Sequence, residues 1–214
     1  MEKTDTIIKS AMYPPKFERD FKEVGNTAFI AARELQPDFV VDDILKSVMR
    51  ALALYFANDP RFEEEGNGKL EKGIFLSGNV GTGKTLLMQA FKKCRKSFYK
   101  ADYSVLSCID IANRYMTEGM ENFYRYFGEP DQSWGYCFDD FGAENISVKY
   151  MGNELNCMEQ IILSRYSRKI PFYRTHFTSN LDADAIERLY GLRVRSRLRE
   201  MVNFIVIDGN DRRK

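Results

Sequence analysis

A glycine-rich stretch, Gly78-Asn79-Val80-Gly81-Thr82-Gly83-Lys84-Thr85, constrains this chain more than any other part of its sequence. The apolar residues Ile74-Phe75-Leu76 precede it and predict a buried strand, and a helical pattern follows it. In this context the glycines let successive backbone N–H groups point at one anion, and the helix start adds unpaired N–H groups. Lys84 would neutralise the β- and γ-phosphates of a nucleotide, and Thr85 would offer its hydroxyl to Mg²⁺. The stretch therefore predicts a nucleotide-binding ATPase.

Composition sets only broad limits on the class of protein. A chain of 214 residues, 44% hydrophobic and 29% charged, predicts one soluble domain with a substantial core. Lys plus Arg (32) nearly balance Asp plus Glu (31), so net charge argues neither for nor against nucleic acid. The four scattered cysteines indicate core thiols in a reducing compartment. With neither an apolar run of spanning length nor a signal peptide, we expect a cytoplasmic protein without membrane contact.

Strand-like runs alternate with helical patterns along most of the chain. We expect strands at 74–76, 103–107, 135–138, 172–178 and 204–207, and helices at 38–57, after the glycine-rich stretch, at 109–127, at 153–169 and after Asp182. This alternation predicts an α/β fold, a parallel sheet with helices on both faces. We assign residues 38–214 to the ATPase domain. Residues 1–37 are expected to be a polar extension that packs on this core through Phe17, Phe21 and Phe29.

Polar residues end two of the expected strands. Asp139 and Asp140 follow the strand at 135–138, and acids at the end of a core strand suggest the Mg²⁺ site in a chain with a phosphate loop. Asp139 would hold the metal through water, and Asp140 would polarise the attacking water. Asn180 ends the strand at 172–178, where its amide would touch the γ-phosphate or that water. We expect His176, inside that strand, to be structural rather than a base.

Three groups of side chains leave contact with nucleic acid open. Lys92, Lys93, Arg95 and Lys96 form either a solvated helix face, which we favour, or a phosphate-backbone contact. The aromatic residues within 115–127 form a core or partner contact, which we favour, or a base-stacking surface. The arginines within 193–199 form a nucleic-acid patch or reach a neighbouring subunit's nucleotide.

Taken together, these stretches resemble the AAA+ ATPases of the DnaC/DnaI helicase-loader and IstB transposition-helper group. Residues 78–85 match the Walker A loop, 138–144 look like the Walker B strand, 177–180 resemble the sensor 1 strand and 190–198 are similar to the box VII helix. The segment 12–17 looks like the proline-aromatic segment that opens the family's ATPase domain. The resemblance implies a P-loop NTPase (AAA+) fold, which we expect here without a separate C-terminal lid domain.

The resemblance also implies roles for single residues. Asn180 becomes sensor 1, which orients the water and the γ-phosphate. Arg197 falls where the family places its arginine finger, which completes the site of the adjacent subunit, so the active form would be a homo-oligomer. Arg212 lies in a C-terminal Gly-x-x-Arg-Arg ending and would act like a sensor 2 arginine.

Two departures from the family pattern bear on function. Position 140 is Asp where many AAA+ proteins have Glu, so its carboxylate lies one methylene further from the water and hydrolysis would be slow. Glu144 is a possible substitute, although we expect it to be a surface or loop acid. The family's loaders also carry an N-terminal domain that grips the helicase, and only a short stretch precedes Pro14-Pro15 here.

Three functions remain open at this point. The first is a DnaC/DnaI-type loader that uses ATP and Mg²⁺ to act on a replicative helicase and DNA, with single-stranded DNA favoured. The second is an IstB-like helper that assembles on duplex DNA for a transposase. The third is a slowly hydrolysing, ATP-locked adaptor, which the Asp at position 140 suggests. A small-molecule kinase is disfavoured because it has no evident use for the arginines of 190–198 or for the Ser179-Asn180 strand end.

Overall fold

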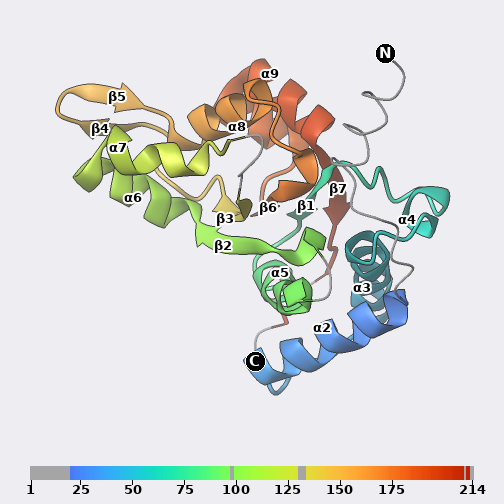
Figure 1. The fold of residues 1–214 in the computed structure, drawn as a ribbon. Helices are drawn as coiled ribbons and strands as arrows, with labels where there is room; N and C mark the ends of the chain where they lie inside the picture. Colours follow the sequence, from blue (N-terminus) through green and yellow to red (C-terminus); the bar gives the residue numbers. More distant parts are fainter. Residues whose placement is uncertain (1–19, 97–98, 130–133, 210, 213–214) are drawn as a thin grey trace, which may run out of the picture.

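The computed structural model describes residues 20–96, 99–129, 134–209 and 211–212, so the expected segment at 12–17, including Phe17, lies outside the described residues. A five-stranded sheet forms its centre (Figure 1). The strands are β1 (Gly73–Ser77), β2 (Tyr103–Ser107), β3 (Gly135–Phe141), β6 (Thr175–Ser179) and β7 (Val202–Val206). They lie in the order β2-β3-β6-β1-β7, and every neighbouring pair is parallel. The predicted α/β fold with a parallel sheet is confirmed.

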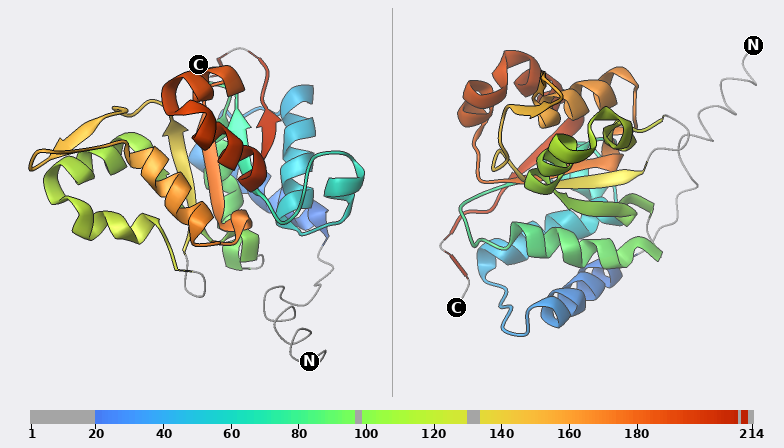
Figure 2. Two further views of the ribbon diagram at one scale, coloured as in Figure 1. Left: turned by 90° about the horizontal axis from the view of Figure 1, so that it is seen from above. Right: turned by 90° about the vertical axis from the view of Figure 1, so that its left-hand side faces the viewer.

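Helices cover both faces of this sheet (Figure 2). One face carries α2 (Phe21–Leu35), α3 (Asp43–Phe56) and α5 (Lys84–Lys92), and the other carries α6 (Cys108–Glu118), α8 (Cys157–Ser167) and α9 (Ala183–Met201). The alternation of side chains along β1 supplies both cores, because Ile74 and Leu76 pack in the first and Phe75 packs in the second. All four cysteines are buried free thiols, as expected.

Short elements complete the chain. They are α4 (Arg61–Glu64), α7 (Met120–Phe123), the antiparallel pair β4 (Val148–Tyr150) and β5 (Asn153–Leu155), and 3₁₀ turns at Lys93–Lys96, Tyr99–Ala101, Tyr124–Tyr126 and Phe172–Arg174. The β4–β5 hairpin extends beyond α6 and α7 at one side of the molecule (Figure 1). Within the part of the chain that the structure describes, no helix has the length and apolar character needed to cross a bilayer.

Helix α2 is the main element that the sequence pattern did not predict. It lies within the expected polar extension, and its N-terminus is capped by Asp20, whose carboxylate accepts a hydrogen bond from the Lys22 N–H. Its buried residues are Val24, Ala28, Ala31 and Ala32, which pack in the same core as α3 and α5. Three of these are alanines, so the stripe lacks the large apolar side chains that mark a core-facing helix. The expected anchor Phe29 is 38% exposed.

Four predicted boundaries are corrected. The helix expected from 38 begins at Asp43, because the carboxylate of Asp42 caps it by accepting from the Leu45 N–H at 2.8 Å. The helix expected from 153 begins at Cys157, because the preceding residues form the β4–β5 hairpin. The strand expected from 172 begins at Thr175, after a 3₁₀ turn, and the last strand begins at Val202.

Candidate nucleotide-binding site

The glycine-rich loop runs from the end of β1 to the start of α5, at the edge where β1, β3 and β6 all end. A cavity of about 670 Å³ lies beside it. Its lining comes from residues 36–42, the loop and first turn of α5, and the ends of β3, β6 and the chain: Gln36, Asp38, Phe39, Val40, Asp42, Val80, Gly81, Gly83, Lys84, Thr85, Leu86, Asp140, Ala143, Asn180 and Arg212. Ligands of doubly wound sheets bind at this carboxyl edge.

Lys84 lies at the neck of the loop. Its Nζ donates to the carbonyl oxygens of Gly78 at 2.7 Å and Asn79 at 2.8 Å, and to Oδ1 of Asn180 at 2.7 Å. The side chain is only 5% exposed, so this ammonium is held in place rather than free in solvent. The structure therefore brings Lys84 and Asn180 into direct contact.

Thr85 and Asp139 also meet. The Thr85 hydroxyl donates to Oδ1 of Asp139 at 2.8 Å, and the Thr178 hydroxyl donates to the same oxygen at 2.6 Å. Burial raises the pKa of Asp139, and these two hydrogen bonds oppose the shift. A hydroxyl and a carboxylate oxygen are ligands that Mg²⁺ accepts, since it takes few protein oxygens and keeps waters and phosphates. Thr178 was not singled out from the sequence, although its place two residues before Asn180 puts it on the strand facing Asp139.

Asp140 lines the cavity with an exposed side chain. Its backbone is left-handed, with φ of 53°, at an irregularity in the β3–β6 pairing between Phe138 and Phe141. The Asp140 N–H donates to Oγ1 of Thr178 at 3.0 Å, which holds this conformation. Asp and Asn tolerate a left-handed backbone better than other side chains do. The bulge thus supplies a physical reason for Asp where many AAA+ proteins have Glu.

Glu144 is not the surface acid that was expected. It is 5% exposed, its Oε2 accepts from the Gly142 N–H at 2.8 Å, and the Tyr190 hydroxyl donates to its Oε1. Burial raises the pKa of Glu144. Both oxygens are used inside the protein and the residue does not line the cavity, so the geometry gives no support to Glu144 as a substitute for residue 140.

The end of the chain lies on the glycine-rich loop. The Arg212 guanidinium contacts Asp42 Oδ2 through Nε at 2.8 Å and Nη2 at 2.7 Å, and Nη1 donates to the Thr82 carbonyl at 3.2 Å. The hydrogen bond from the Leu45 N–H, helped by Arg212, lowers the pKa of Asp42. A Cβ added at Gly81, whose φ is 79°, would collide with the Asp211 carboxylate. The tail therefore joins the loop to the start of α3, a contact that sequence patterns did not reveal.

Arg197 lies on α9, away from this cavity. Its guanidinium stacks over the Tyr166 ring, 4.2 Å from the centroid, and its Nη1 donates to Glu200 Oε1 at 2.9 Å. The structure does not bring Arg197 to the cavity of its own chain.

The groups of residues for which nucleic-acid contact was left open differ in their exposure. Tyr115, Phe123, Tyr126 and Phe127 are buried in the core, as favoured, and Tyr124 is exposed. Lys92 and Lys93 are at least partly exposed, whereas the side chains of 95 and 96 lie outside those described.

Among the described residues, no group of three or more His, Cys, Asp or Glu side chains is arranged to hold a metal ion.

A comparison with solved structures decides the fold. The chain is similar to the crystal structure of the DnaC helicase loader, with a TM-score of 0.53 and 17% sequence identity, over 81% of this chain and 95% of that one. The fold is that of the AAA+ P-loop ATPases. The sequence matches no family model and no curated protein.

Two further structures show weaker likeness to this chain. One is a protein from Streptococcus pyogenes serotype M3 described as a primosome component, with a TM-score of 0.49 and 21% identity over 82% of this chain and 85% of that one. The other is AMPPCP-bound DnaA from Aquifex aeolicus, with a TM-score of 0.49 and 21% identity over 80% of this chain. The chain spans 49% of that DnaA chain.

Proposed function

We propose that this protein binds ATP with Mg²⁺ in the cavity beside the glycine-rich loop and hydrolyses it. The observation that carries the proposal is the meeting of Lys84, Thr85, Asp139 and Asn180 at the mouth of one loop. They come from three separate sequence signals, and all four lie at the carboxyl edge of the sheet, where ligands of such sheets bind.

The side chains have distinct roles in this proposal. The loop from Gly78 to Gly83 cradles the phosphates with its N–H groups, and Lys84 exchanges loop carbonyls for phosphate oxygens. Thr85 and Asp139 would hold Mg²⁺, and the ion would neutralise the charge of the phosphates. Asp140 polarises the attacking water, and Asn180 contacts the γ-phosphate. Arg212 serves as a further cation in the lining of the cavity, and Phe39 and Val40 offer apolar surface to the base.

We further propose that Arg197 completes the site of a second copy of the chain. Its position on the surface of α9, outside its own cavity, supports a role in trans. Arginine fingers raise phosphoryl-transfer rates by about 10³-fold or more. The active form would therefore be a homo-oligomer.

The partner is proposed from the fold and the motifs together. A DnaC/DnaI-type role, in which ATP turnover remodels or loads a replication protein on DNA, fits the AAA+ fold shared with a helicase loader. The ATP-locked adaptor is the second candidate, and the short carboxylate of Asp140 favours it, because a distant base gives slow turnover.

The deciding experiment measures ATP turnover per subunit against protein concentration, with and without single-stranded DNA, at fixed Mg²⁺. An assembling ATPase gives a rate that climbs with concentration and rises again with DNA, and Arg197→Ala binds ATP but loses that rise. A flat, near-zero rate despite tight ATP binding would instead favour the adaptor. Normal turnover by Arg197→Ala would rule out the finger.

A further inference from the structure

Arg197, Tyr166 and Glu200 form a closed cluster between α8 and α9. The Tyr166 hydroxyl donates to Glu200 Oε2 at 2.6 Å, while Arg197 Nη1 donates to Glu200 Oε1 at 2.9 Å and to the Tyr166 hydroxyl oxygen at 3.1 Å. The Tyr166 ring in turn stacks on Phe172, with centroids 6.0 Å apart and planes 15° apart. The guanidinium is thus fixed by a ring face and by two polar partners.

These contacts within one chain compete with the contacts that Arg197 would make to the nucleotide of another copy. A guanidinium that reaches a γ-phosphate must present its N–H groups to phosphate oxygens, and Glu200 occupies Nη1 with an anionic acceptor of the same kind. The cluster lies at the surface, since the Arg197 side chain is 34% exposed and that of Glu200 48%. Exposed pairs of this kind are weak, so a second chain could displace Glu200.

We propose that Tyr166 and Glu200 are positioning residues that restrain Arg197 in the isolated chain. Docking of a second copy exchanges Glu200 for that copy's nucleotide phosphate, while the Tyr166 ring keeps hold of the guanidinium face. The inference rests on the proposed function, because it assigns a regulation to the proposed finger. In the isolated chain Arg197 is therefore held by Glu200 and Tyr166, and it becomes available to a nucleotide only when a second copy docks.

The test is ATP turnover against protein concentration at saturating ATP and Mg²⁺, for the full chain and its variants. Glu200→Gln keeps the shape but removes the charge that competes with phosphate. We expect its half-saturating protein concentration to fall by about two- to five-fold, the range that loss of one exposed pair allows, with the plateau rate unchanged. Tyr166→Phe, which removes the hydroxyl and keeps the ring, shifts the value in the same direction.

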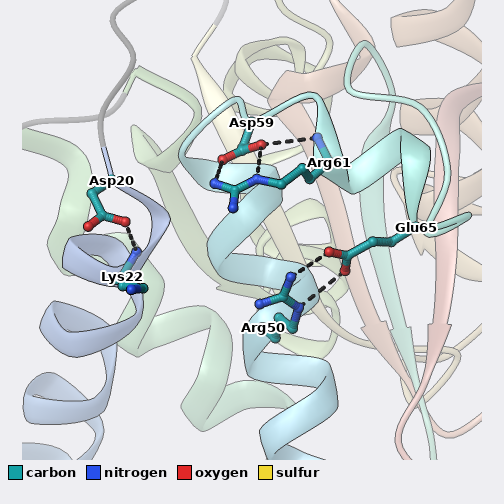
Figure 3. Close-up of polar contacts among 6 residues, drawn as sticks. All are labelled: Asp20, Lys22, Arg50, Asp59, Arg61 and Glu65. Carbon is teal, nitrogen blue, oxygen red and sulfur yellow. Dashed lines mark hydrogen bonds and ion pairs between the residues drawn. The ribbon is translucent and has the colours of Figure 1, made fainter.

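A matched control is available elsewhere in the chain. Arg50 and Glu65 form another exposed Arg–Glu pair, joined by two hydrogen bonds (Figure 3), and neither residue lines the cavity. Glu65→Gln therefore makes the same charge change, and we expect it to leave the half-saturating concentration as in the unmodified protein.

The outcomes separate this inference from the function on which it rests. An unchanged or higher half-saturating concentration for Glu200→Gln, with turnover lost in Arg197→Ala, overturns the restraint and leaves the finger standing. Full turnover in Arg197→Ala would show that Arg197 is not an arginine finger, and it would overturn the proposed restraint as well.

Discussion

At the scale of single residues, burial decides the charge of the one histidine. His176 is fully buried on β6, and the Ile74 N–H donates to its Nδ1 at 3.0 Å. Its Nε2 has no hydrogen-bond partner among the described residues. Burial, followed by the positive charges of Lys100 and Arg165, lowers the pKa of His176 to about 3. The ring is neutral in the folded protein and away from the cavity, which confirms the expected structural role.

This lowered pKa makes stability depend on pH. Above pH 6.5 the ring is neutral in both states, whereas between 6.5 and about 3 only the unfolded chain takes up the proton. We expect His176 to lower the free energy of unfolding by about 1.4 kcal/mol per pH unit as pH falls through that window. In His176→Asn, which keeps an acceptor near Ile74 but does not titrate, urea unfolding from pH 7 to pH 4.5 should show a shallower decline. Equal slopes would contradict this.

Asp140 offers a second test at this scale. Asp140→Asn keeps a side chain that tolerates the left-handed backbone but removes the carboxylate, so turnover should fall about a hundredfold with unchanged stability. Asp140→Glu lengthens the side chain, so turnover rises if reach to the water is the limit. Since Glu suits a left-handed φ of 53° poorly, that variant should also lose about 1 kcal/mol of unfolding free energy. Unchanged turnover in Asp140→Glu would count against reach as the limit.

At the scale of elements, α9 is two helical pieces joined at Gly191. Its φ of 82° and ψ of 167° lie in a region that essentially only glycine occupies. This break separates Tyr190, whose ring stacks on Phe141 beside Asp140, from the half of α9 that carries Arg197. Both pieces still pack in one core, through Ile186 and Tyr190 before the break and through Val194, Leu198 and Met201 after it.

Two glycine substitutions should move stability in opposite directions. Gly191→Ala has free space for a Cβ but the wrong backbone, so it should lose about 1–3 kcal/mol of unfolding free energy. Gly25→Ala, inside α2, meets only Ala53 Cβ at an ordinary 3.6 Å, so it should gain about 0.5–1 kcal/mol. Urea unfolding of both variants measures this. A stabilised Gly191→Ala protein would mean that α9 straightens without cost.

At the scale of the whole molecule, the cavity joins parts of the chain that are far apart in sequence. Its lining extends from Gln36 through the glycine-rich loop and β3 to Arg212. A ligand held there contacts the segment before α3, the first turn of α5, the end of β3, the residue after β6 and the tail at once. Binding should therefore stabilise the fold as a unit.

This linkage predicts a thermal shift. Mg²⁺–ATP at about 100 times its dissociation constant adds about 2.7 kcal/mol, which raises the Tm by roughly 5–10 °C for a chain of this size. Lys84→Ala should abolish that shift. Lys92→Ala, which removes the same charge from the far end of α5 outside the cavity, should keep it. A full shift in Lys84→Ala would place the nucleotide elsewhere.

The sequence by itself determined the features that depend on neighbours along the chain. The glycine spacing, with Lys84 and Thr85 directly after it, predicts a phosphate loop because a backbone bend and a helix start are local events. Alternating strands and helices determined the parallel sheet, and a parallel sheet brings the ends of β1, β3 and β6 to one edge. Asp139 and Asn180 could be predicted as neighbours at that edge for this reason.

Only the tertiary structure decided the contacts between distant segments. Arg212 meets Asp42 across 170 positions, and the Tyr190–Glu144 and Arg197–Tyr166 contacts join elements whose periodicity carries no record of their partners. The alanine-rich stripe of α2 was missed because small side chains give a weak apolar pattern even where they pack closely. Periodicity identifies which face of an element is buried, whereas packing in three dimensions decides what that face meets.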